Sequence, residues 1–177
     1  MSINIYLRAF EYDDLSFINK IRNDNELFEY TLGNKYYISS VWDKNWIEDK
    51  ILNNSNQLYL MICSAELNEP IGYGAVTNID YVNRKAELGG ILIAKEFASK
   101  GYATQASKLF IGHLFEELGL NMLYTFIRED HIISLRLAEN LGLKKQGLLP
   151  DYVYKRNKFH NAYILTLLRS DYEKNKG

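Results

Sequence analysis

Apolar and polar positions follow two different periods along this chain, and the two periods predict two kinds of element. Runs rich in β-branched and aromatic residues, bounded by turn residues, predict strands at 3–9, 57–66, 70–79, 85–93, 121–128, 147–155 and 161–169. Apolar residues spaced three and four apart predict helices at 12–23, 39–53, 101–119 and 130–142. The resulting order predicts an α/β sandwich with a mixed sheet, in which strands 85–93 and 121–128 are parallel neighbours.

Length and composition narrow the class of protein. The chain has 177 residues, so one domain spanning 1–177 is expected, with 47% hydrophobic and 24% charged residues. The net charge of −1 argues against a nucleic-acid partner, and no apolar run is long enough to cross a membrane. Cys63 is the single cysteine, and no secretory signal is visible, which predicts a cytoplasmic protein. No Cys/His cluster has metal-ligand spacing, so no metal is expected.

Acidic residues concentrate near the beginning of the chain. Positions 11 to 29 contain six acidic residues but only two basic ones, Lys20 and Arg22. The acidic residues are Glu11, Asp13, Asp14, Asp24, Glu26 and Glu29. Two interpretations stay open: these carboxylates form solvated helix faces, or they form an acidic rim that attracts a cationic substrate.

The stretch "KEFASKGYATQASKLF", from Lys95 to Phe110, carries the strongest chemical signal. It follows a strongly apolar strand and enters a helix near Gly101 through small side chains. Small residues let backbone N–H groups approach an anion, and a helix N-terminus adds unsatisfied N–H groups and a positive dipole end. The patterns of a P-loop and of a dinucleotide fingerprint are both absent. The stretch therefore predicts a pyrophosphate-binding connection of another type.

Two segments resemble motifs of the GCN5-related N-acetyltransferases (GNAT). In "IAKEFASKGYATQA", Gly101 and Ala103 match the end of motif A, whereas Ala98 replaces its Gln or Arg and Ser99 replaces a frequent glycine. In "HIISLRLAENLGLKKQG", five positions match motif B of the branch that contains ribosomal-protein N-terminal and spermidine acetyltransferases; they are Ser134, Leu137, Glu139, Gly142 and Gly147. His131 replaces an asparagine and Leu143 a phenylalanine. The resemblance spans about residues 3–172.

This resemblance implies a fold and a co-substrate. The fold is a mixed, mostly antiparallel sheet with one splayed parallel strand pair, flanked by about four helices. The co-substrate is acetyl-CoA, whose pantetheine arm would meet the backbone of Ile91, Leu92 and Ile93. The other implied CoA-binding residues are Ala98, Ser99, Lys100, Gly101, Tyr102, Ala103 and Thr104 at the pyrophosphate, with His131 and Ser134 near the pantetheine. Gly89 and Gly90 indicate either a bulge in this strand or tight packing under a helix.

The catalytic residues are less strongly indicated. Glu87 is an acid inside an apolar strand, at a position where several members of the branch carry Glu, and it could accept the proton of the amine. It could instead be a solvent-facing residue paired with Arg84 or Lys85. Many family members use a motif B tyrosine as general acid, but Ala138 stands at that position. Tyr154, with Tyr152 as an alternative, is therefore the candidate.

Several functions stay open within this frame. The expected reaction is direct acetyl transfer to a primary amine, with a small cationic acceptor such as a polyamine, an amino sugar or an antibiotic. A protein N-terminus is the rival acceptor. Two further alternatives are an enzyme that transfers a longer acyl group and a module that binds acyl-CoA without turnover. Whether the chain forms a homodimer also stays open. Cys63 is expected to be a buried hydrophobe rather than a nucleophile.

Overall fold

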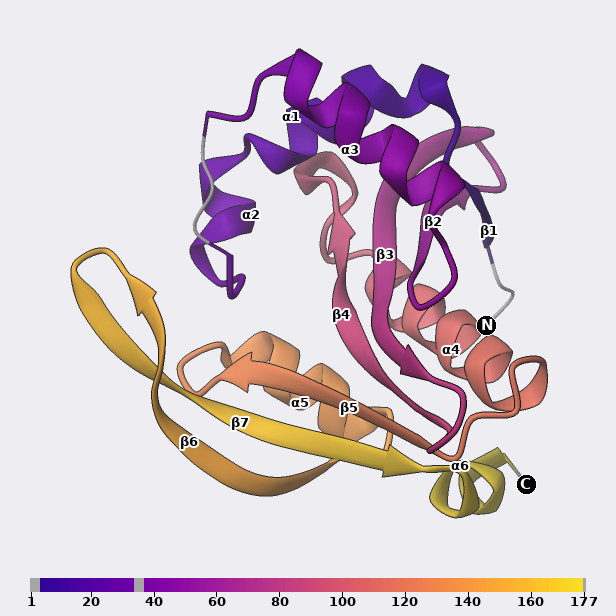
Figure 1. Ribbon diagram of the computed structural model, residues 1–177, viewed down its shortest axis with the longest axis vertical. Helices are drawn as coiled ribbons and strands as arrows, with labels where there is room; N and C mark the ends of the chain where they lie inside the picture. Colours follow the sequence, from indigo (N-terminus) through magenta and orange to yellow (C-terminus); the bar gives the residue numbers. More distant parts are fainter. Residues whose placement is uncertain (1–3, 34–36, 177) are drawn as a thin grey trace.

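The computed structural model describes residues 4–33 and 37–176, and its described strands form one mixed sheet (Figure 1). The strand order across the sheet is β1-β2-β3-β4-β5-β7-β6. The strands are β1 (Ile5–Ala9), β2 (Leu58–Ser64), β3 (Glu69–Asp80), β4 (Lys85–Ile93), β5 (Met122–Arg128), β6 (Lys144–Lys155) and β7 (Lys158–Leu168). All neighbours are antiparallel except β4 and β5, which are parallel. The mixed sheet with one parallel pair is confirmed.

Six α-helices flank the sheet in the described chain. They are α1 (Leu15–Arg22), α2 (Asn25–Glu29), α3 (Ser40–Leu52), α4 (Tyr102–Glu116), α5 (Ile132–Asn140) and α6 (Arg169–Lys176). Each of the four predicted helices is present. The sequence pattern missed the short helices α2 and α6, because neither carries an apolar stripe longer than a turn or two.

Several element ends differ from the predicted ones for local reasons. A 3₁₀ turn at Tyr12–Asp14 precedes α1, so the predicted helix begins as a tighter turn. Helix α5 begins after His131 rather than at Asp130, because the Asp130 carboxylate binds the Arg128 guanidinium instead of capping the helix. Strand β6 begins at Lys144, three residues before the predicted start. The apolar pattern missed these residues because they are polar and exposed at the edge of the sheet. Ile3, in the first predicted strand, lies outside the described residues.

Two hydrophobic cores lie on the two faces of the sheet. Strand alternation separates them: in β2, Ile62 contributes to one core, whereas Met61 and Cys63 contribute to the other. Helices α4 and α5 cover the first face, and α1 and α3 cover the second. Cys63 is 1% exposed and is a core residue, as expected.

The sheet opens between β4 and β5. The two strands pair only from Lys85–Glu87 to Met122–Tyr124. The Thr125 hydroxyl then donates a hydrogen bond of 2.9 Å to the Leu88 carbonyl, and beyond it the strands diverge. Figure 1 shows β5, β7 and β6 turning away from the half of the sheet that holds β1 to β4. This divergence leaves one edge of β4 without a neighbouring strand.

Candidate active site

A cavity of about 760 Å³ occupies the opening between β4 and β5. Its walls come from β4, β5, α4 and α5, and from the segment that runs from α2 to Gly33. Most of the lining is apolar, with a small number of polar groups: Glu26, Glu87, Thr125, His131 and Ser134 are among them. A mostly apolar pocket with a few converging polar side chains is the usual form of a substrate site.

Strand β4 is distorted where it lines this cavity. Its pairing with β3 shifts between Ala75–Gly90 and Val76–Leu88, so Gly89 is the extra residue of a β-bulge. Gly90 has φ +105°, a value that side chains strongly disfavour. The two glycines are exposed, which decides between the two interpretations of this pair in favour of a bulge. Beyond the bulge, Ile91, Leu92 and Ile93 pair with β3 on one side and line the cavity on the other.

The turn before α4 follows the cavity directly along the chain. Gly101 is the N-cap of α4 with φ +80°, and Ser99 has φ +61°. Both are exposed, and a Cβ added at Gly101 would meet no atom within 4 Å. Because the first N–H groups of a helix have no partner inside the helix, those of the first turn of α4 are available to an anion. Lys100 adds a positive charge near this turn, with its ammonium over the Phe97 ring.

These features fit an acyl-CoA co-substrate. The open edge of β4 offers backbone groups to an extended pantetheine chain, and the exposed left-handed turn and the α4 N-terminus suit a pyrophosphate. Ala103, in the first turn of α4, lines the cavity and links the two features. Of the expected CoA-binding residues, six lie in or beside the exposed turn and do not line the cavity; they are Ala98, Ser99, Lys100, Gly101, Tyr102 and Thr104.

Glu87 lines the cavity at the point where β4 and β5 separate. Its Oε2 accepts a hydrogen bond of 2.8 Å from the Asn78 amide, a neighbour on β3. Burial raises the pKa of Tyr124 and of Tyr152, and the negative charge of Glu87 adds to both shifts. Neither Arg84 nor Lys85 forms an ion pair with Glu87 in the described structure, where Arg84 binds the Gly119 carbonyl. The solvent-facing ion pair considered for Glu87 is therefore not what this geometry shows.

Aromatic rings from the first half of the chain form the opposite wall. Trp46, Tyr59 and Tyr73 pack edge to face around this part of the cavity. Burial raises the pKa of Tyr59 and of Tyr73, so both hydroxyls stay protonated at neutral pH. The charge of Arg22 is neutralised by Asp43 at 3.2 Å, and its guanidinium lies 3.9 Å from the centre of the Trp46 ring.

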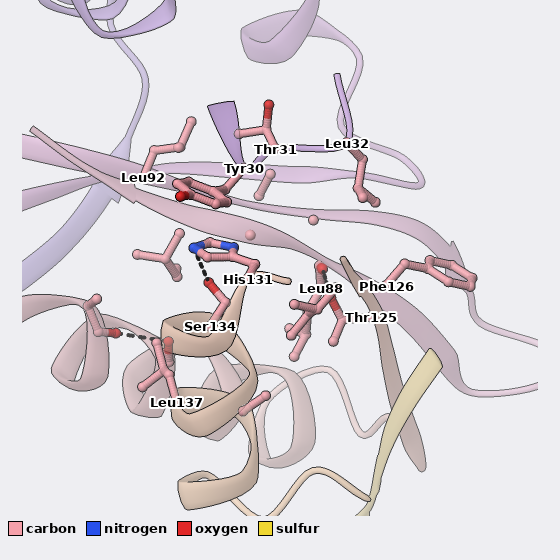
Figure 2. Close-up of a pocket in the computed structure, with 18 of the residues that line it drawn as sticks. Tyr30, Thr31, Leu32, Leu88, Leu92, Thr125, Phe126, His131, Ser134 and Leu137 are labelled. Carbon is pink, nitrogen blue, oxygen red and sulfur yellow. Dashed lines mark hydrogen bonds between the residues drawn. The ribbon is translucent and has the colours of Figure 1, made fainter. Parts of the chain in front are cut away.

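His131 and Ser134 come together at the N-terminus of α5. The His131 Nε2 lies 3.2 Å from the Ser134 hydroxyl, and the Tyr30 ring stacks on the imidazole with centres 4.7 Å apart. Figure 2 shows this stack inside the pocket, close to Leu88 and Leu92 of β4. Burial, and then the charge of Arg128, lowers the pKa of His131, so the ring is uncharged at neutral pH.

Tyr154, expected as a catalytic residue, does not line the cavity. Its hydroxyl donates a hydrogen bond of 2.8 Å to the Asn157 side chain, and its ring packs against Phe159 at the tip of the β6–β7 hairpin. The position along β6 explains this correction: Tyr154 shares a face of the strand with Tyr152 but lies two residues further toward the hairpin tip, where it binds Asn157. Tyr152 lies nearer, stacked on Phe126, whose ring lines the cavity. Ala138, at the usual tyrosine position, lines the cavity as well.

Most of the acidic N-terminal residues are engaged within the protein. Asp14 is buried and paired with Arg8, Asp24 caps α2 and pairs with Lys95, and Glu29 pairs with Arg156. Glu26 alone of the six lines the cavity. Sequence reasoning missed the aromatic wall, Tyr30 and Thr125, because they come from α3, β2, β3 and β5 and from the segment after α2, which are far apart in the sequence.

Among the described residues no group of three or more His, Cys, Asp or Glu is arranged to hold a metal ion. No helix in that part of the chain has the length and apolar character of a membrane span.

Residues 4–144 match the model of the acetyltransferase (GNAT) domain family, and the chain belongs to this family. It is therefore an acetyl-CoA-dependent N-acetyltransferase, which decides against a binding module without turnover.

Three relatives show how far the likeness extends. The chain is 25% identical over 173 residues to the spermidine N(1)-acetyltransferase of Escherichia coli K12, covering 96% of this chain and 88% of that protein. It is 35% identical over 105 residues to a putative ribosomal N-acetyltransferase of Bacillus subtilis, covering 59% and 57%. The spermidine N-acetyltransferase of Vibrio cholerae, solved in complex with CoA and spermine, has the same fold with a TM-score of 0.90, 24% identity, and coverage of 97% and 99%.

Proposed function

We propose that this enzyme acetylates a small cationic amine, of which a polyamine is the best-supported example, with Glu87 as the group that accepts the proton of the amine. The carrying observation is the position of Glu87: it stands beside the bulge of β4, in the same cavity as the aromatic wall. A primary ammonium has a pKa near 10, so it must lose a proton before it can attack a thioester.

We assign two parts of this cavity to the two substrates. Between β4, α4 and α5, apolar side chains and the open edge of β4 would hold the pantetheine, with His131 and Ser134 at one side. When bound, acetyl-CoA supplies the activated acetyl group. The acceptor would bind where Glu26, Glu87, Trp46 and Tyr59 line the cavity, beside the Tyr30 ring that stacks on His131. Carboxylates and aromatic faces both stabilise organic cations, and the uncharged His131 adds no opposing charge.

The relatives support the same acceptor class. The Escherichia coli protein is named as a spermidine acetyltransferase, and the Vibrio cholerae protein was crystallised with spermine. A protein N-terminus is the second candidate, favoured by the higher identity of the putative ribosomal N-acetyltransferase over its shorter match. Because the free N-terminus of a peptide is also an ammonium group, Glu87 would serve either acceptor. The acceptor must therefore be identified by turnover.

An acceptor screen by mass spectrometry tests the proposal. The protein is incubated with acetyl-CoA and, in separate reactions, with spermidine, spermine, an aminoglycoside and peptides with free N-termini. We expect a polyamine to be acetylated with the highest kcat/KM, and a reaction without the protein serves as the control for uncatalysed transfer. A kcat/KM for a peptide above that for every small amine would overturn the proposed acceptor class.

A further inference from the structure

A buried lysine on β6 contacts the last turn of α2 and the residues that follow it. Lys155 is 2% exposed, although most of β6 is exposed. Its Nζ donates hydrogen bonds to the Phe28 carbonyl and, at 2.7 Å, to the Thr31 carbonyl. Within the described chain it forms no ion pair with a carboxylate. A lysine is rarely buried without a partner of opposite charge, because removing its charge from water is costly.

Two arginines contact the same short segment. Arg128, which is 3% exposed at the end of β5, donates a hydrogen bond of 2.7 Å to the Glu29 carbonyl. Arg156, beside Lys155, pairs with the Glu29 carboxylate at 2.7 Å. Three cations from the far half of the sheet therefore bind the last turn of α2. We name Lys155, Arg128 and Arg156 the basic clamp.

The basic clamp supplies hydrogen-bond donors and positive charge to the C-terminus of α2, which is too short to be stable alone. A helix of five residues is too short to be stable alone, and the last carbonyls of any helix have no partner within it. Cations at a helix C-terminus satisfy these carbonyls and complement the negative end of the helix dipole. Lys155 and Phe28 are 127 residues apart in the chain, so this stabilisation depends on tertiary structure.

The clamped segment is also a wall of the cavity. Its six lining residues are Leu27, Phe28, Tyr30, Thr31, Leu32 and Gly33. Figure 2 shows Tyr30, Thr31 and Leu32 across the pocket from Thr125 and Phe126 of β5. Because Tyr30 of this segment stacks on His131, the segment borders the pantetheine side of the cavity as well as the part assigned to the acceptor.

We propose that Lys155 is a positioning residue for the amine acceptor: it holds the segment from Leu27 to Gly33 in place as one wall of the acceptor region. It does not touch the reacting atoms, and it does not line the cavity. The acceptor part of this inference rests on the proposed function. The mechanical part, that Lys155 holds the segment, stands on the contacts alone.

Lys155→Met tests both parts, because methionine keeps the length of the side chain and removes its charge and its donors. Lys158→Met, at an exposed lysine on the same hairpin, is the matched control for loss of charge. Amide hydrogen exchange is measured across residues 25–33, and steady-state kinetics use spermidine with saturating acetyl-CoA. The affinity for CoA is measured by calorimetry.

We expect Lys155→Met to accelerate exchange in 25–33 and to raise the KM for spermidine about 10-fold to 100-fold, the range for lost hydrogen bonds to a charged group. The kcat should stay within about twofold, and the affinity for CoA should fall by less than the KM for spermidine rises, because the pantetheine is assigned mainly to β4 and only Tyr30 stacks on His131 from this segment. Lys158→Met should match the wild type. Unchanged exchange would overturn the mechanical part, and faster exchange with an unchanged KM would overturn the role toward the acceptor.

Failure of the proposed function gives a different result. If the wild-type protein acetylates neither spermidine nor any other small amine, the acceptor part falls with it. The exchange rates of 25–33 then still decide whether Lys155 holds the segment.

Discussion

Glu87 is held in a defined orientation by Asn78, with its second oxygen left for other partners. Glu87→Gln keeps the size of the side chain and an oxygen that can accept from Asn78, but it removes the basicity. General base catalysis contributes roughly 10²–10⁴-fold, so we expect kcat/KM near neutral pH to fall on the order of 100-fold. The loss should shrink at high pH, where more of the amine is already uncharged. A pH profile of kcat/KM for both proteins provides the measurement.

Glu26→Gln is the comparison that separates proton transfer from charge attraction. Glu26 lines the same cavity but pairs with Lys95 at 2.9 Å on an exposed rim. Its loss should raise the KM for a cationic amine and leave kcat near the wild-type value. If Glu87→Gln behaves in the same way, Glu87 binds the cation and is not the base. An unchanged profile would remove Glu87 from the site altogether.

Cys63 provides a residue-scale test of direct transfer. It is buried in the core between β2 and α1, away from the cavity lining, and burial raises the pKa of its thiol. A protonated, inaccessible thiol is a poor nucleophile. Cys63→Ala should therefore retain most of the turnover, with a loss of stability from the smaller side chain. Ping-pong kinetics, or an acetylated Cys63 found by mass spectrometry, would contradict direct transfer.

At the scale of elements, the turn before α4 brings two left-handed residues, Ser99 and Gly101, to one exposed place. Ser99 stands where the family frequently has glycine, and its φ of +61° explains that preference, because glycine adopts such values at no steric cost.

Gly101→Asp and Gly101→Asn form a matched pair for this turn. Both side chains tolerate a left-handed φ better than most, and they differ by one negative charge. Asp would place that charge beside the pyrophosphate, so we expect the affinity for acetyl-CoA to be on the order of 100-fold lower than in the Asn variant. Calorimetry on the two folded proteins measures this difference, which should shrink at high salt. Equal affinities would mean that the pyrophosphate binds elsewhere.

At the scale of the whole molecule, the basic clamp joins the N-terminal helices to the half of the sheet that diverges from β4. The pKa of Lys155 is lowered from 10.5 to about 8, mainly by burial and also by the charges of Arg128 and Arg156, while the charge of Glu29 opposes the shift. Between pH 8 and 10.5 the unfolded chain therefore binds a proton that the folded chain does not. Stability rises with pH wherever the unfolded state binds more protons, so the wild type gains stability across this window.

Lys155→Met lacks this titration. The difference between the melting temperature of Lys155→Met and that of the wild type should favour the variant most at pH 7. This difference should shift toward the wild type as the pH is raised toward 10. Thermal unfolding of both proteins at several pH values measures the trend, with Lys158→Met as the control for an exposed lysine. A difference that stays constant with pH would show that Lys155 has an ordinary pKa in the folded protein.

The local pattern of the sequence was sufficient to predict much of the fold. Strand β4 begins and ends where its apolar run predicted, and Gly101 begins α4 as expected. Gly142, the last residue of the predicted helix, follows α5 with φ +90°. Strand and helix periods, bulge glycines and caps depend on neighbours a few residues away, so a single sequence contains them. The motifs around Gly101 and His131 were readable for the same reason.

Tertiary structure alone decided the acceptor side of the cavity. Tyr30, Trp46 and Tyr73 reach it from three elements, and nothing in the sequence distinguishes them from the other aromatic residues. It also decided that Tyr154 points away from the cavity while Lys155, one residue on, is buried under α2. These outcomes depend on where β5, β7 and β6 diverge from β4, and on contacts across more than 100 residues. A period along the chain reports which side of an element is buried, but not which distant element covers it.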